Sequence, residues 1–185
     1  TLGPLREGLH RFETTRDGIQ ALIRDVYAAI RPRTDRLSAH GHTAWKPGCG
    51  LTYLVVWLEE VAKIFNKISD SDQEMLLEIL KEARSAGISL VFSLQRADWS
   101  QMPTLVRGQL SKMTFGVENA HDAGFGLSDA QDDAGARPEL WGTRYPGMAY
   151  LDAPSVDEGR IAMPLRTYLW SGDGEQMRAH CAEFP

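Results

Sequence analysis

The sequence Leu54-Val55-Val56-Trp57-Leu58-Glu59-Glu60 is a short apolar run that ends in two adjacent glutamates. A run of this length that is rich in β-branched residues predicts a strand that is buried on both faces. The two carboxylates would follow the carboxyl end of that strand, the edge where open α/β sheets bind ligands. The alternative is that Glu59 and Glu60 only begin the next helix, since negative charge is favourable at a helix amino terminus.

A helix and a second strand follow this run. Residues 71–74 (Ser-Asp-Gln-Glu) have the pattern of a capping box, and the apolar stripe after them is closed by Gly87. Residues 88–94 (Ile-Ser-Leu-Val-Phe-Ser-Leu) predict a buried strand that ends in Gln95-Arg96. A strand, a helix and a strand with this spacing form a parallel crossover unit. Gln95 is therefore predicted at the same sheet edge as the two glutamates.

Two acids and an amide at one sheet edge suit the hydrolysis of a nucleoside triphosphate. Such chemistry needs one acid that holds Mg²⁺ through its water shell and a second that orients the attacking water. Glu59 fits the first role and Glu60 the second, while Gln95 is placed to sense the γ-phosphate and position water. The alternative for Gln95 is a buried amide that only ends its strand.

These residues carry a resemblance to a known family. The segment from residue 54 to about residue 127 resembles the second half of the motor domain of the FtsK/SpoIIIE family of DNA-pumping ATPases, especially its TraB-like plasmid-transfer branch. The family's Walker B strand ends in Asp-Glu before a hydrophobic helix, and here the sequence is Glu59-Glu60-Val61-Ala62-Lys63-Ile64-Phe65. The family's next strand ends in Gln-Arg, matched by Gln95-Arg96. The likeness extends to residues 14–39, 102–117 and 135–151.

The resemblance implies an α/β fold, a RecA-like P-loop ATPase core with a mainly parallel sheet flanked by helices, truncated at its amino end. We expect one partial motor domain over residues 1–185, with the Walker B strand over 54–60, the following strand over 88–95 and a terminal strand pair over about 148–170. The implied cofactors are ATP and Mg²⁺. Glu60 and Gln95 would be catalytic, Glu59 would bind the metal through water, and Arg96 would contact the nucleotide.

The resemblance also implies a partner and a location. The protein would move double-stranded DNA as a homo-oligomeric ring, a hexamer, in conjugative plasmid transfer or chromosome segregation. It would be cytoplasmic and reach the membrane only through parts outside this chain. Two alternatives stay open: an ATPase of type VII protein secretion, which shares the fold but moves polypeptide, and a binding module without catalysis.

The sequence departs from the family pattern at two places. Glu59 stands where the Walker B strand usually has Asp, so its carboxylate is one methylene farther from the backbone. Residues 122–124 are Asp-Ala-Gly, where the family commonly has Asp-Ser-Arg with an arginine that acts across the subunit boundary. Arg107, Lys112 and Arg166 remain as candidates for a cation that acts in trans or contacts DNA, although Arg166 also fits an exposed cation on an edge strand.

The 185 residues contain no phosphate-binding loop. A Walker A motif is a glycine-rich run that ends in Lys-Ser or Lys-Thr at the start of a helix. The glycine pairs at 48–50, 124–126 and 172–174 lack that ending and predict turns. We expect the chain to be the carboxyl-terminal portion of a motor domain and to be inactive as an ATPase by itself.

The composition is that of an ordinary globular protein, with 43% hydrophobic residues, and no apolar segment is long enough to span a bilayer. The net charge of −5 disfavours a broad nucleic-acid surface, because duplex binding relies on Lys and Arg. A few basic side chains that face a ring channel would still be compatible with DNA. Cys49 and Cys181 form no framework pattern, which favours a reduced protein.

The remaining segments predict scaffold. A helix begins near Thr14-Thr15, and Pro32 is expected to kink or end it before a shorter helix over 34–39. Residues 126–142 are polar and predict a surface helix or loop. Two strands are predicted over 148–151 and 160–168, with Pro164 confining the second to an edge or a bulge, and a short helix is expected over 171–184.

Overall fold

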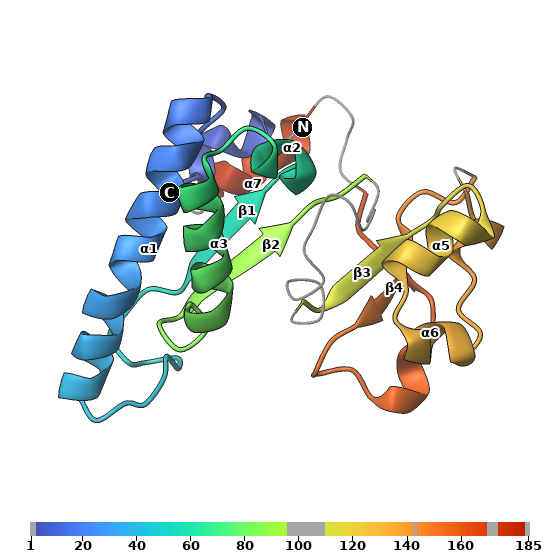
Figure 1. Cartoon of the computed structure of the whole chain (residues 1–185). Helices are drawn as coiled ribbons and strands as arrows, with labels where there is room; N and C mark the ends of the chain where they lie inside the picture. Colours follow the sequence, from blue (N-terminus) through green and yellow to red (C-terminus); the bar gives the residue numbers. More distant parts are fainter. Residues whose placement is uncertain (1–2, 96–109, 143, 170–173, 184–185) are drawn as a thin grey trace. The chain divides into compact units, whose positions relative to one another are not determined.

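The structure of the chain is a computed structural model that describes residues 3–95, 110–142, 144–169 and 174–183 (Figure 1). The chain divides into two compact units. One comprises residues 13–109, and the other comprises residues 1–12 together with 110–185. Arg96 and Arg107 lie outside the described residues.

The unit of residues 13–109 contains the predicted parallel crossover. Its elements are α1 (Arg16–Ala39), β1 (Leu54–Leu58), α2 (Val61–Phe65), α3 (Asp70–Glu82) and β2 (Ile88–Phe92). β1 and β2 pair in parallel, with a register that runs from Leu54 opposite Ile88 to Leu58 opposite Phe92. α1 and α3 pack against each other (Figure 1). The α/β class and the parallel pair flanked by helices are thus confirmed.

The core of this unit lies on one face of the two strands. Ile23, Ile30 and Leu37 are seven residues apart along α1, which keeps them on one helix face, and all three are buried. Leu58 and Ile88 are buried as well. Successive strand residues point to opposite faces, and on the other face Val55 is 61% exposed and Trp57 is 52% exposed. The prediction that this strand is buried on both faces is therefore wrong for the described structure.

α1 passes through Pro32 without ending. Thr15 caps the helix by accepting a hydrogen bond from the Gly18 amide at 3.1 Å, and a single helix then runs to Ala39. A proline inside a helix costs about 3 kcal/mol. Pro32 is exposed, however, and the buried Ile30 and Leu37 lie on either side of it. Beyond Pro32, burial of Leu37 contributes about 1.5–3 kcal/mol, and the Arg33 side chain adds hydrogen bonds to the Ala86 and Thr52 carbonyls. These contacts offset the cost of the proline.

α3 begins two residues earlier than predicted. Its N-cap is Ser69, whose hydroxyl accepts from the Asp72 amide at 3.2 Å. Both Ser69 and Ser71 have an acidic residue three positions later, so the capping pattern alone does not distinguish them. The burial of Asp72 beside Ser69 explains why the earlier serine is used.

The other unit is built on an antiparallel sheet with the order β3-β4-β5. Its strands are β3 (Lys112–Phe115), β4 (Met148–Asp152) and β5 (Leu165–Arg166). β5 is an edge strand, as Pro164 predicted, but Pro164 itself lies just before the strand and not within it. The strand is shorter than the expected 160–168, because a 3₁₀ turn (η3, Glu158–Arg160) and the turn after it occupy the first part of that range.

Helices complete this unit. They are α5 (Ala120–Gly126), α6 (Asp129–Asp133), α7 (Glu175–Glu183) and the 3₁₀ helices η1 (Gly3–Gly8) and η2 (Pro138–Leu140). α7, which matches the helix predicted over 171–184, packs against η1, where the Cys181 Sγ lies 3.7 Å from the Leu5 carbonyl oxygen. The core of the unit contains Ala123, Leu127, Ala136 and Tyr150.

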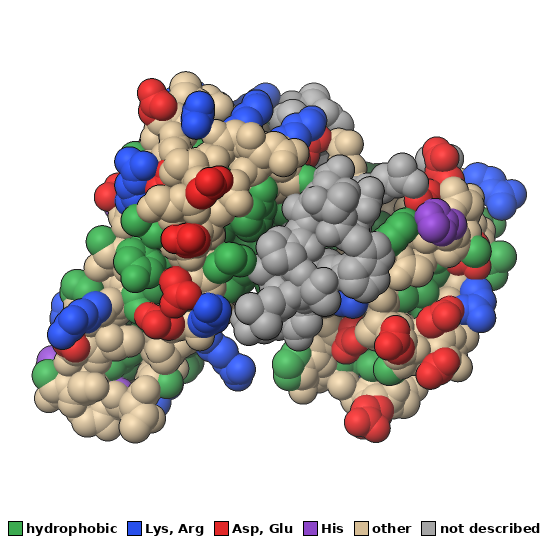
Figure 2. All heavy atoms as spheres, in the orientation of Figure 1, with side chains coloured by type: hydrophobic (Ala, Val, Ile, Leu, Met, Phe, Trp, Pro, Cys, Tyr) green, Lys and Arg blue, Asp and Glu red, His purple; other side chains and the backbone are tan. Residues whose placement is uncertain are grey.

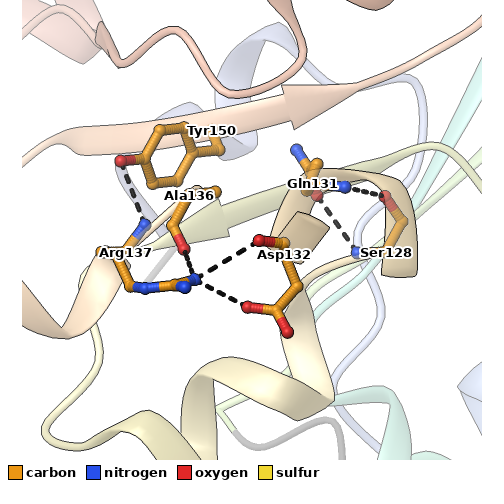
Figure 3. Close-up of polar contacts among 6 residues, drawn as sticks. All are labelled: Ser128, Gln131, Asp132, Ala136, Arg137 and Tyr150. Carbon is orange, nitrogen blue, oxygen red and sulfur yellow. Dashed lines mark hydrogen bonds and ion pairs between the residues drawn. The ribbon is translucent and has the colours of Figure 1, made fainter. Parts of the chain in front are cut away.

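Hydrogen bonds between polar groups hold α6 and the residues after it against this core (Figure 3). Ser128 and Gln131 form a reciprocal capping box, and the fully buried Gln131 amide donates to the Ile161 carbonyl at 3.1 Å. The Tyr150 hydroxyl accepts from the Arg137 amide at 3.2 Å. The aspartates of α6 are exposed, as the prediction of a surface helix requires, and acidic side chains cluster over this helix in Figure 2. The prediction is wrong for Gln131, which is buried.

Candidate functional site

The two glutamates lie in a turn between β1 and α2. The Ser93 amide donates to the Leu58 carbonyl at 3.0 Å, and the Val61 amide donates to the Ser93 carbonyl at 3.1 Å. Ser93 thus pairs with residues on both sides of Glu59-Glu60, which leaves the two acids outside the ladder. The strand predicted over 54–60 accordingly ends at Leu58, and the strand predicted over 88–95 ends at Phe92.

Glu60 has an unusual backbone conformation. Its φ of 53° and ψ of 53° are left-handed, and it is the one non-glycine residue with positive φ in the part of the chain that the structure describes. This conformation costs about 1–2 kcal/mol for a residue with a Cβ. Glu60 is also the N-cap of α2, yet its side chain makes no capping hydrogen bond. A side-chain capping bond therefore does not explain the glutamate here, although its negative charge at the amino end of α2 is favourable.

The Glu60 carboxylate instead has two side-chain partners. The Gln95 amide nitrogen donates to Glu60 Oε1 at 2.6 Å, and the Lys63 ammonium forms an ion pair with Oε2. The Glu60 side chain is 30% exposed. Gln95 is exposed, which does not fit the alternative of a buried amide that only ends a strand. The structure thus brings together Glu60 and Gln95, which the crossover topology predicts at one sheet edge.

Glu59 takes no part in these contacts. It is exposed, and its carboxylate has no hydrogen-bond or ion-pair partner among the described residues. A carboxylate without a partner is free to accept hydrogen bonds from metal-bound water. No group of three or more His, Cys, Asp or Glu side chains in the described ranges is arranged to hold a metal. A Mg²⁺ ion at Glu59 would need ligands other than the described His, Cys, Asp and Glu side chains, such as water.

The predicted cations are distributed over the rest of the chain. Lys112 lies in β3, where its ammonium donates to the Leu127 carbonyl at 3.4 Å, and Arg166 lies exposed in the edge strand β5. Both belong to the other unit. The cation found beside Glu60 is Lys63, which the sequence analysis did not single out. Its position three residues after Glu60, at the start of a helix, is the signal that would have identified it.

Asp72 anchors the helices behind the site. This fully buried carboxylate accepts from Arg24 Nε at 2.7 Å and Nη2 at 3.0 Å, from Gln20 at 2.5 Å and from the Ser69 hydroxyl at 2.5 Å. Burial alone would raise the pKa of Asp72, but the hydrogen bonds from Arg24, Ser69 and Gln20 lower it to about 2. The network joins α1 to α3.

Two further hydrogen bonds connect this scaffold to the site. The Gln73 side chain of α3 donates to the Phe65 carbonyl at the end of α2, at 2.9 Å. The Arg33 guanidinium of α1 donates to the Ala86 and Thr52 carbonyls, at 2.7 and 2.5 Å, just before the two strands begin. α2 and both strands are thereby held by the same pair of packed helices.

In the described parts of the chain, no helix has the length and apolar character needed to cross a membrane.

Comparisons with known proteins find similarity at the level of structure. No protein-family model and no curated protein matches the sequence. The pCW3 conjugation coupling protein TcpA, in a monomer form with ATPγS, superposes with a TM-score of 0.71 at 13% identity, over 97% of this chain and 52% of that one. The cytoplasmic domain of the Thermomonospora curvata type VII secretion ATPase EccC gives a TM-score of 0.51 at 18% identity, over 74% of this chain and 17% of that one.

At these identities the likeness concerns the fold. This chain spans about half the length of the coupling protein and a smaller part of the secretion ATPase. The structure thus has an α/β fold with a parallel strand pair flanked by helices, and nearly the whole of this chain shares its fold with about half of a conjugation coupling protein.

Proposed function

We propose that this chain is part of an ATP-driven translocase in which Glu60 orients the water that attacks the γ-phosphate. The observation that carries the proposal is the strained turn after β1, which places the Glu60 carboxylate against Gln95 at the carboxyl edge of the parallel strands. Strained backbone at a ligand-binding edge is a common property of functional sites. The coupling protein with the similar fold was solved with ATPγS, which supports a nucleotide as the ligand.

Each residue has a distinct role in this proposal. Glu60 accepts a hydrogen bond from the attacking water, and Gln95 fixes the carboxylate while its amide oxygen is left to contact the water or the γ-phosphate. Glu59 would hold Mg²⁺ through a water ligand, and the chemistry that such an ion would supply is neutralisation of charge on the phosphate oxygens. The longer glutamate side chain is compatible with this water-mediated contact.

The chain supplies only the acidic part of such a site. The glycines at 48 and 50 have φ of 84° and 77° and lie in the loop before β1, and those at 124 and 126 belong to α5. None of them precedes Lys-Ser or Lys-Thr. In our proposal the β- and γ-phosphates are held by a phosphate-binding loop from residues outside these 185, and ATP hydrolysis is a property of a longer protein that contains them.

Double-stranded DNA is the transported substrate that we propose, in conjugative plasmid transfer. The fuller superposition with the conjugation coupling protein than with the secretion ATPase favours DNA over polypeptide. We further propose a homo-hexameric ring in the cytoplasm, attached to the membrane through other parts of the protein. The chain has a net charge of −5, and acidic side chains gather over α6 (Figure 2). DNA contacts would therefore be confined to a few cations, for which Arg107, Lys112 and Arg166 are candidates.

The test is the ATPase rate of a full-length protein that contains this chain, measured with duplex DNA, with single strands and without DNA over a salt series. A duplex translocase should be stimulated by duplex DNA, and the stimulation should fall steeply with salt, because each phosphate contact releases counterions. Equal rates under the three conditions would favour the protein-export alternative. An absence of hydrolysis under all of them would favour a binding module.

A further inference from the structure

We propose that Lys63 is a positioning residue that restrains Glu60 before the site is assembled and thereby lowers the rate of hydrolysis without substrate polymer. The inference rests on the proposed role of Glu60 and adds a regulatory contact to it. Its starting point is that both oxygens of the Glu60 carboxylate are engaged in this structure, Oε1 by Gln95 and Oε2 by Lys63.

The two contacts differ in kind. Gln95 follows β2 and Glu60 follows β1, so their contact joins the segments after two paired strands. It therefore depends on the pairing of β1 with β2. Lys63 belongs to the first turn of α2, and its backbone amide donates to the Glu60 carbonyl at 2.8 Å. Lys63 is therefore held beside Glu60 by local helix geometry. Its ammonium occupies one acceptor position on Oε2 and so competes with a water that Glu60 is to orient.

Solvent exposure makes the Lys63 contact easy to break. The Lys63 side chain is 68% exposed and that of Glu60 is 30% exposed. Ion pairs of this exposure are weak, and losing one changes an equilibrium by no more than about fivefold. In the nucleotide-bound state, the water that Glu60 is to orient competes directly with such a contact, so the contact lowers kcat and leaves nucleotide binding unchanged. The ammonium can then leave without any rearrangement of the backbone, because the amide of Lys63 keeps its hydrogen bond to Glu60.

The experiment is steady-state ATPase kinetics without substrate polymer, using Lys63→Met in a full-length protein that contains this chain. Methionine keeps the apolar stem of lysine and removes the charge. We expect kcat to rise about two- to fivefold, in line with the weakness of the pair, while KM for ATP stays unchanged. Lys63→Arg, which retains a cation, should restore the wild-type kcat. Lys67→Met is the matched control, since Lys67 is exposed and makes no side-chain ion pair with any described residue.

An unchanged or lower kcat in Lys63→Met, with thermal unfolding as in the wild type, would overturn the inference. So would an equal rise in Lys67→Met, which would mark a general effect of charge. Glu60→Gln, measured in parallel, separates this proposal from the proposed function. If Glu60→Gln is inactive and Lys63→Met behaves as wild type, only the role of Lys63 fails. If Glu60→Gln hydrolyses ATP normally, the proposed function fails as well.

Discussion

Protonation of Asp72 should account for a defined part of the acid sensitivity of this chain. The carboxyl group is fully buried and bonded to Arg24, Gln20 and Ser69. Its pKa is lowered from 3.8 to about 2, which corresponds to about 2 kcal/mol of stability when the group is ionised. Because the folded-state pKa is the lower one, this contribution is present above about pH 4 and is lost as the pH falls through about 2.

Urea unfolding of the 185-residue chain at a series of pH values tests this prediction, with Asp72→Asn as the variant. Between pH 5 and pH 2 the wild-type free energy of unfolding should fall by about 2 kcal/mol more than that of Asp72→Asn, which has no carboxyl to protonate. Asp70→Asn, an exposed neighbour in the same helix turn, should follow the wild-type curve. Parallel curves for wild type and Asp72→Asn would refute the assignment of this stability to Asp72.

Three further outcomes are expected. Glu60→Gly should be about 1 kcal/mol more stable than Glu60→Ala in urea unfolding. Both variants lose the carboxylate, but only glycine adopts the left-handed conformation without cost. Equal stability would contradict the strain assigned to this turn. Gly87→Ala should lower the free energy of unfolding by about 2 kcal/mol more than Gly48→Ala. Both glycines have positive φ, but of the two only Gly87 lies where a Cβ would meet a side chain, the ring of Trp45. Similar losses of stability in the two variants would count against that contact. The purified 185-residue chain should show no ATP turnover. If it does hydrolyse ATP, and Glu60→Gln abolishes that activity, an external phosphate-binding loop is not needed.

The parallel unit was predictable because each signal in it is local. The apolar runs before Glu59 and Gln95, separated by one amphipathic helix, leave few topologies open. The register of β1 on β2 then brings Glu60 within a hydrogen bond of Gln95. The roles assigned to Glu59, Glu60 and Gln95 stay predictions, as does the single motor domain over residues 1–185.

Other features depend on tertiary contacts that sequence patterns do not contain. Pro32 predicts a helix end, but the helix continues because residues beyond it make tertiary contacts: Leu37 is buried and Arg33 donates to the Ala86 and Thr52 carbonyls. Gln131 looks like a surface residue in a polar segment, but it is buried because its amide reaches the Ile161 carbonyl thirty residues away. The exposure of Trp57 likewise depends on what covers the second face of the sheet, which an apolar run does not specify.

The central claim is that Glu60 orients the attacking water, and Glu60→Gln in a full-length protein tests it most directly. Nucleotide binding, followed with a fluorescent ATP analogue, should be retained, because the amide keeps the size of the side chain. Hydrolysis should fall by about 10²–10⁴-fold, the contribution expected of a positioned general base. Glu74→Gln, at an exposed glutamate of α3, should leave both unchanged. Near-normal turnover by Glu60→Gln would contradict the account, whereas retained binding with lost turnover is the result that it predicts.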